Sequence, residues 1–192
     1  YNKMSNVKIL RLNNCANNSR VSQDTDKSGF KYLLDQDLIN NGRCLIEVIS
    51  GWSQITQQTI NGAGAITATT RIVPNNIPQL VIRSNILQEG EDTITGGGGL
   101  ILGTMCLTNL DAVSGTNSAL STNSANFNQN DSLSFICERL PSQIHLERLY
   151  WSDNPADPTS IPVLVEANNI SLLNPPLIPF EVVLKITFID ME

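Results

Sequence analysis

Charged side chains are scarce in this sequence. Asp, Glu, Lys and Arg make up 16% of the 192 residues, well under the usual quarter, while Asn, Ser and Thr are abundant. The formal net charge is −6, and no cluster of Lys and Arg is longer than a pair. The protein is therefore expected to rely on uncharged polar groups for solubility and not to bind nucleic acid directly.

Long apolar runs are also missing. No stretch approaches the ~18 apolar residues that a membrane-spanning helix needs, so no membrane span is predicted. The start, "YNKMSNVKIL", lacks the long apolar core of a signal peptide, and no export signal is expected.

The metal-ligand patterns that histidine and cysteine usually form are absent as well. His145 is the only histidine. The four cysteines, Cys15, Cys44, Cys106 and Cys137, are widely spaced and contain no Cys-x-x-Cys pair, which excludes the usual zinc frameworks. They are interpreted as free thiols, with two disulfides as the alternative if the protein matures outside the cell. No metal, cofactor or catalytic residue is assigned.

Helical periodicity is weak throughout the chain. No long segment keeps a 3.6-residue apolar period, although "KYLLDQDLI" at 31–39 can form a short helical turn. Two-residue alternation is strong instead, most clearly at 180–189, where the alternate side chains are apolar. The polar residues between them, Glu181, Lys185 and Thr187, are expected on a largely wet face. The strands expected from alternation and β-propensity are 6–12, 30–34, 42–50, 65–73, 79–87, 99–108, 131–140, 143–151 and 180–189.

Polar tracts rich in Asn, Ser, Gly and Pro separate these strands, and loops are expected at 88–99 and 114–130. No internal repeat of ~20–50 residues is visible, so a propeller or β-helix is disfavoured. The predicted fold class is all-β. We expect a two-sheet antiparallel sandwich of jelly-roll type with about eight or nine strands, forming a single domain over residues 1–192.

The stretch "DTDKSGFKYLLD" at 24–35 matches the spacing of a calcium-binding EF-hand loop. Its oxygen ligands would come from Asp24, Asp26, Ser28 and Asp35, with Gly29 at the sharp turn. The preceding "NNCANNSRVSQ" has no helical pattern, so the EF-hand context fails and a turn into a strand is predicted instead. A calcium site of another kind on this turn stays open as an alternative.

Glycines and tryptophans supply two further candidate sites. The run Gly96–Gly99 leads into a predicted strand and lacks the Gly-Lys-Ser/Thr end of a P-loop, so it is interpreted as a loop tip. Trp52 and Trp151, each placed just after a predicted strand, suit either a sugar-stacking platform or a packed rim.

Catalytic groups have simpler structural explanations. His145 shares a strand face with Glu147 and is interpreted as a surface or interface histidine, because no nucleophile motif accompanies it. A glycosidase pair among the clustered carboxylates is disfavoured because acidic residues are common in turns. These carboxylates are Asp153, Asp157, Glu89, Glu91 and Asp92.

Five phrases give the order of strands and turns: "VKILRLNN", "GFKYLLD", "PQLVIRSNIL", "ERLPSQIHLERLYW" and "PFEVVLKITFID". In these phrases the chain resembles the single-jelly-roll penton and minor capsid proteins of large icosahedral double-stranded DNA viruses and virophages. The likeness covers most of the chain. It implies a homo-oligomer, pentameric in the penton members, that contacts major and minor capsid proteins and assembles into the virion in the host cell cytoplasm.

The resemblance implies a structural virion protein and not an enzyme. Its expected role is that of a penton or minor capsid subunit, which builds or stabilises an icosahedral shell through strand-edge and loop contacts. The near-absence of reactive groups in the sequence agrees with that role. The alternative function is a carbohydrate-binding β-sandwich, a lectin or adhesin, assisted by calcium at Asp24, Asp26 and Ser28.

Overall fold

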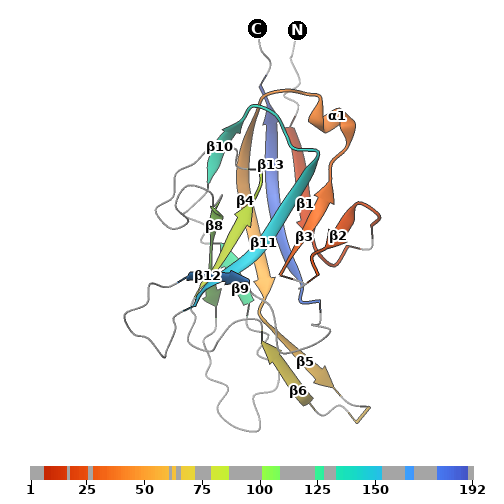
Figure 1. Cartoon of the computed structure of the whole chain (residues 1–192), viewed down its shortest axis with the longest axis vertical. Helices are drawn as coiled ribbons and strands as arrows, with labels where there is room; N and C mark the ends of the chain where they lie inside the picture. The colour runs from red at the N-terminus through yellow and green to blue at the C-terminus, as the bar shows by residue number, and fades with distance from the viewer. Residues whose placement is uncertain are drawn as a thin grey trace.

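Strands form nearly all of the regular structure of this chain (Figure 1). The computed structural model describes residues 7–16, 18–25, 28–60, 62–63, 66–71, 79–86, 101–108, 124–127, 133–152, 163–166 and 177–189. These residues contain thirteen strands and one helix of four residues, so the predicted all-β class is confirmed. Within the same ranges, no helix is long and apolar enough to cross a membrane.

The elements follow one another along the chain with a single helix between the third and fourth strands. They are β1 (Val7–Asn13), β2 (Val21–Gln23), β3 (Gly29–Leu33), α1 (Gln36–Ile39), β4 (Cys44–Gln54), β5 (Thr56–Ile60), β6 (Ile66–Arg71), β7 (Gln79–Ser84), β8 (Ile101–Thr108), β9 (Ser124–Phe127), β10 (Ser134–Cys137), β11 (Gln143–Ser152), β12 (Val163–Glu166) and β13 (Phe180–Phe188).

Nine strands overlap those expected from the sequence, and α1 lies inside the predicted helical turn at 31–39. Strands β2, β5, β9 and β12 were not expected. The prediction of a loop over 114–130 is wrong at β9, which pairs with β4 and β8. The predicted loop at 88–99 lies outside the described residues.

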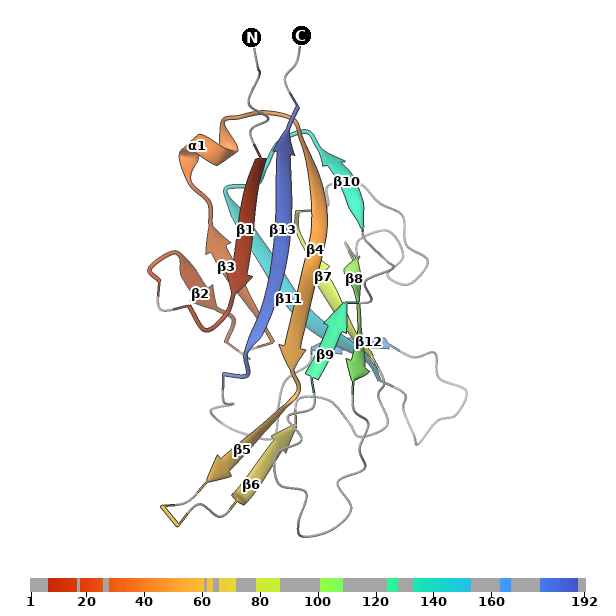
Figure 2. The same ribbon diagram turned by 180° about the vertical axis from the view of Figure 1, so that it is seen from behind.

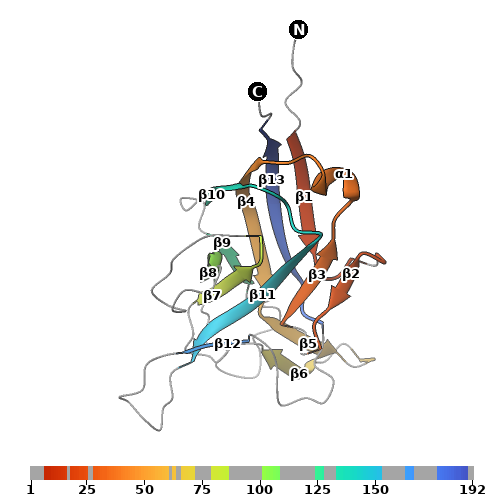
Figure 3. The same ribbon diagram turned by 45° about the horizontal axis from the view of Figure 1, so that its top comes forward.

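Eleven of the strands form one antiparallel sheet. Their order is β1-β13-β4-β9-β8-β7-β11-β3-β2, with β10 also paired to β4 and β12 to β11. The sheet is curled, so that β1, β13 and β4 lie side by side in one layer, while β3, β11 and β7 cross behind them in Figure 2 and in front of them in Figure 3. Strands β5 and β6 form a separate hairpin that projects from the lower end of the sheet in Figures 1 and 2.

The hydrophobic core lies between the two layers of the curled sheet. Phe30 of β3 and Phe180 of β13 meet there edge to face, with ring centroids 5.1 Å apart. The five alternate apolar residues of β13 are all buried, as the sequence predicts: Phe180, Val182, Leu184, Ile186 and Phe188. Burying a large apolar side chain stabilises the fold by about 1.5–3 kcal/mol, so β13, between β1 and β4, is a main source of stability.

The other face of β13 departs from the prediction at Glu181. This residue was expected to face water, yet it is only 8% exposed. Arg11 Nη1 donates a hydrogen bond of 2.8 Å to Glu181 Oε1, and Asn13 Nδ2 donates one of 3.2 Å to Oε2. The neighbouring strand β1 therefore supplies polar partners that allow this carboxylate to lie within the sheet surface.

Strand β4 continues to Gln54, past the end predicted at residue 50. A bulge near that position shifts its inward-facing positions by one residue. Its pairing with β13 passes from Val48 to Ser50 opposite consecutive residues of β13, so Ile49 is the extra residue. Before the bulge Cys44, Ile46 and Val48 are buried; after it the buried positions are Gly51, Ser53 and Ile55. One inserted residue inverts the period-two pattern, and the strand keeps one buried side throughout.

A buried arginine joins the two layers. Arg148 of β11 is 1% exposed, and its guanidinium carbon lies 4.8 Å from the centroid of the Phe180 ring. Its Nε donates to Ser28 O at 3.1 Å, and its Nη1 donates to Ser53 Oγ at 3.2 Å and Ile178 O at 3.0 Å. One side chain thus contacts residues from β4, from the approach to β3 and from the approach to β13.

Three cysteines have described side chains, and all three are free thiols: Cys15, Cys44 and Cys137. Cys44 and Cys137 are directly opposite each other in the β4–β10 pair and both are buried. The Cys44 thiol donates a hydrogen bond to the Cys137 sulfur, which raises the pKa of Cys44 and lowers the pKa of Cys137 to about 7.

Candidate functional site

The outward face of β11 carries two polar residues that form part of a candidate functional site. Ile144, Leu146 and Arg148 are buried, whereas His145 and Glu147 point to the opposite side of the sheet. This confirms the face predicted for His145. Because side chains two residues apart in a strand share a face, His145 and Glu147 lie next to each other.

The neighbouring strands bring two basic residues and one glycine beside them. In the register of the sheet, Arg83 of β7 lies opposite Glu147, and on the other side Gly29 and Lys31 of β3 lie opposite Glu147 and His145. Arg83 Nε donates a hydrogen bond of 2.6 Å to Glu147 Oε2. Glu147 is therefore held through one carboxylate oxygen, while its second oxygen faces His145.

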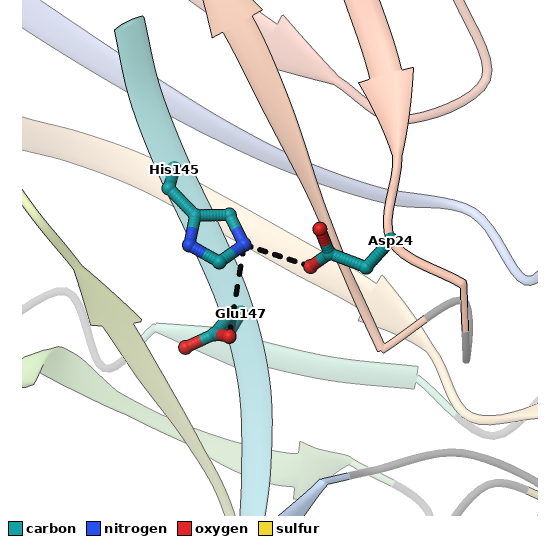
Figure 4. A group of neighbouring side chains, drawn as sticks. All are labelled: Asp24, His145 and Glu147. Atoms are coloured by element: carbon teal, nitrogen blue, oxygen red, sulfur yellow. Dashed lines mark hydrogen bonds and ion pairs between the residues drawn. The ribbon is translucent and has the colours of Figure 1, made fainter.

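Asp24 reaches this face from the turn between β2 and β3. Its backbone N–H donates to Gly29 O at 3.1 Å, which closes the turn. Its side-chain Oδ2 lies 2.7 Å from His145 Nε2, and Glu147 Oε1 lies 3.6 Å from the same ring nitrogen (Figure 4). Two carboxylates thus converge on one imidazole nitrogen. We name these three residues the Asp24–His145–Glu147 cluster.

Gly29 makes room for the cluster. A Cβ atom at this position would lie 2.4 Å from Leu146 O and 2.5 Å from Asp24 Oδ2. The sequence suggests a turn role for Gly29, but the structure gives it a second one at the start of β3. Only a residue without a side chain lets the Asp24 carboxylate cross over β3 to reach His145.

The cluster is partly screened from water. The side chains of Asp24, His145 and Glu147 are 17%, 26% and 18% exposed. A half-buried arrangement of one imidazole nitrogen and two carboxylate oxygens is chemically suited to binding a cation or to exchanging a proton. The alternation of the sequence predicts that His145 and Glu147 share a face, whereas Asp24 was expected in a turn into a strand, with a calcium site there as the alternative.

The EF-hand reading of residues 24–35 fails in the structure for the reason predicted. Strand β2 precedes Asp24, and Gly29 begins β3. Ser28 is 1% exposed, and Asp35 follows β3 and pairs with Arg20 at 2.5 Å, an interaction that lowers the pKa of the Asp35 carboxyl. Asp24 and Asp35 therefore contact different partners, His145 and Arg20, and Asp26 lies outside the described residues.

The two tryptophans named as candidates lie in different strands. Trp52 lies within β4 and is half-buried, and Trp151 lies within β11, so both are inside strands and not after them. Several other candidates lie outside the described residues: Gly96–Gly99, Asp153, Asp157, Glu89, Glu91 and Asp92.

No protein-family model matches this chain, and the chain has no significant match among curated proteins or solved structures.

Proposed function

We propose that this protein is a jelly-roll shell subunit, a penton or minor capsid protein that assembles with copies of itself. The observation that carries the proposal is the strand order. With β2, β5, β6, β9 and β12 set aside, the pairings of the other eight strands run β1-β13-β4-β10 and β3-β11-β7-β8, and β9 joins these two runs into one curled sheet through β4 and β8. Numbered one to eight along the chain, the two runs are 1-8-3-6 and 2-7-4-5. Two interlocked Greek keys produce this order, and capsid subunits are among the proteins that use it.

The distribution of exposed apolar residues supports a contact surface on one layer. Six large apolar side chains are exposed among the described residues, and four of them lie on the outer face of β1-β13-β4-β10. These four are Val7, Ile9, Ile49 and Ile136, and their exposed fractions are 39%, 56%, 51% and 53%. An apolar group of this kind on a sheet face is typical of a protein–protein interface.

The sheet register places Val7 and Ile136 at the two ends of one row across this layer. Val7 lies opposite Thr187, which lies opposite Leu45, which lies opposite Ile136, so one row crosses the whole layer. Among the described strands, β1 pairs only with β13 and so leaves its second edge available to a neighbouring subunit. A closed ring would repeat one such contact around an axis, with the pentamer as the expected form.

Sedimentation of the isolated chain tests the proposal. We expect wild-type protein to sediment as a homo-oligomer. The double variant Ile9→Lys with Ile136→Lys should sediment as a folded monomer, because two desolvated ammonium groups would oppose the contact. The matched control is Leu33→Lys, which changes a residue of β3 that is 48% exposed and should leave the oligomer intact.

A wild-type chain that stays monomeric at high concentration would reject autonomous assembly. Persistence of the oligomer in the double variant would place the contact elsewhere and remove the support given by the outer face. Electron microscopy of the oligomer then tests its symmetry, for which a five-fold ring is expected.

A further inference from the structure

The Asp24–His145–Glu147 cluster presents three potential ligand atoms to one small volume. His145 Nε2, Asp24 Oδ2 and Glu147 Oε1 all lie within 4.8 Å of one another. A ring nitrogen carries at most one proton, yet two carboxylate oxygens face it here (Figure 4). We infer that this cluster is a binding site for a divalent transition-metal ion of the zinc type.

The distances within the cluster suit such an ion. Zinc binds histidine nitrogen and carboxylate oxygen at about 2.0–2.2 Å, so tetrahedral ligand atoms stand about 3.4 Å apart. The two nitrogen–oxygen distances, 2.7 Å and 3.6 Å, lie on either side of that value. A small outward rotation of the Asp24 carboxylate would lengthen the shorter of the two distances toward that value. Three protein ligands would leave a fourth position for water.

The ligands are held by the backbone of paired strands. His145 and Glu147 belong to β11, which is paired on both sides by β3 and β7. The backbone N–H of His145 also donates to Asn85 Oδ1 at 2.7 Å, and the turn carrying Asp24 is closed by its hydrogen bond to Gly29. Ligands fixed in this way lose little conformational freedom when an ion binds.

Arg83 supports the site from one side. Its Nε binds Glu147 Oε2 at 2.6 Å and leaves Oε1 to face the imidazole. Hydrogen bonds from outside the ligand set commonly orient metal-binding carboxylates in this manner. The two carboxylates offer a divalent cation a formal charge of −2, which Arg83 and Lys31, opposite His145 in the sheet, partly offset.

The ligand chemistry favours a transition metal over calcium. Calcium takes six to eight oxygen ligands, whereas this cluster offers one imidazole nitrogen and two carboxylates. Imidazole is a preferred ligand of zinc, copper, nickel and iron. The bound ion would tie the β2–β3 turn to β11 and so stabilise this layer of the sheet. This inference does not depend on the proposed shell function.

Titration with Zn²⁺ alone tests the site. The protein should carry Cys15→Ser, because Cys15 is an exposed thiol that can bind zinc by itself. Isothermal titration calorimetry should give one equivalent of Zn²⁺ per chain, and the melting temperature should rise with added Zn²⁺. His145→Gln should weaken binding about tenfold or more, and Asp24→Asn and Glu147→Gln should each weaken it as well.

The matched control is Glu47→Gln, which removes a half-buried carboxylate from an ion pair with Lys185 on the opposite layer and should leave zinc affinity unchanged. Circular dichroism without metal checks that each variant is folded. If one ligand variant does not fold, the other two still test the site. The inference is overturned if the Cys15→Ser protein shows no saturable binding at millimolar Zn²⁺. It is equally overturned if the folded ligand variants bind as tightly as their parent.

Discussion

At the scale of single residues, Arg148 shows how a charged group is accommodated in this core. Each hydrogen-bond partner of the guanidinium also makes a second hydrogen bond. Ser28 O accepts one from the backbone N–H of Arg148, and Ile178 O accepts one from Asn14 Nδ2. Ser53 Oγ in turn donates to Gln54 O. Removing the guanidinium therefore leaves each of these groups with another hydrogen bond, and the main loss is one of packing.

Two substitutions of Arg148 should therefore lower the free energy of unfolding by different amounts. Arg148→Met keeps most of the side-chain volume and should lower the free energy of unfolding by about 1–2 kcal/mol. Arg148→Ala leaves a cavity beside Phe180 and should lower it by about 3 kcal/mol or more. Urea denaturation measures both values. Equal losses in the two variants would show that the charge, and not the packing, is what stabilises the core.

Period-two alternation predicted much of what single residues do. It placed His145 and Glu147 on one face and the alternate residues of β13 in the core. The same two-residue alternation puts Arg148 on the inward face with Ile144 and Leu146, although an arginine is ordinarily expected on the surface. The approach of Asp24 to His145 was not predictable, because it joins residues far apart in the chain and depends on the register of β3 with β11.

At the scale of elements, β9 is the strand that connects the two layers through β4 and β8. It lies in a polar tract, "SANF", in which Phe127 is the only large apolar residue, so alternation could not reveal it. The Phe127 ring packs against two glycines: a Cβ at Gly51 would lie 2.4 Å from the ring, and one at Gly103 would lie 2.7 Å from it. Tertiary packing, more than local propensity, therefore creates this strand.

A double-mutant cycle tests that packing. Gly51→Ala should destabilise the wild-type protein by about 1–3 kcal/mol, because its methyl group overlaps the Phe127 ring. In a Phe127→Ala background the same change should cost less, because only the flexible end of Met105, whose Cε lies 2.9 Å from the added Cβ, then stands close, and the coupling energy should be about 1 kcal/mol or more. Gly62→Ala, where a Cβ meets nothing within 4 Å, serves as the control. The same loss in both backgrounds would contradict the contact.

The β4–β10 pair carries a second element-scale prediction. Directly opposed residues of antiparallel strands have Cβ atoms about 4.5–5.5 Å apart, so Cys44 and Cys137 need only a small shift to form a disulfide. Treatment with a diazene oxidant such as diamide should link them: each thiol loses a proton, and the two electrons reduce the oxidant. The Cys137 thiolate attacks, so the rate should rise from about pH 6 to about pH 8, through its pKa of about 7.

Peptide mapping by mass spectrometry identifies the linked pair. Cys15→Ser removes the exposed thiol among the three described cysteines and with it cross-linking between chains through Cys15. A Cys44→Ser variant should resist formation of this product. Recovery of Cys44 and Cys137 as separate thiols from the Cys15→Ser protein after prolonged oxidation at pH 8 would contradict the prediction.

At the scale of the whole molecule, the first and last strands close the fold. β1 pairs with β13 along its full length, from Val7 opposite Thr187 to Asn13 opposite Glu181. The chain therefore enters and leaves this layer at the same end of the sheet. Contacts of such large sequence separation make folding of a β-rich chain slow, because the loop must close before the pair is stabilised.

Circular permutation tests this closure. Joining residue 192 to residue 1 with a short Gly/Ser linker, and opening the chain between Asn41 and Gly42 after α1, keeps every strand intact. This permutant should fold cooperatively with a melting temperature within a few degrees of wild type, because the β1–β13 pair already holds the two ends together. Opening the chain inside β4, between Ile46 and Glu47, should abolish folding, because β4 pairs with β13, β9 and β10. Thermal unfolding followed by circular dichroism distinguishes the two permutants. If the first permutant does not fold and the second one does, the strand order on which the proposed shell function depends is refuted.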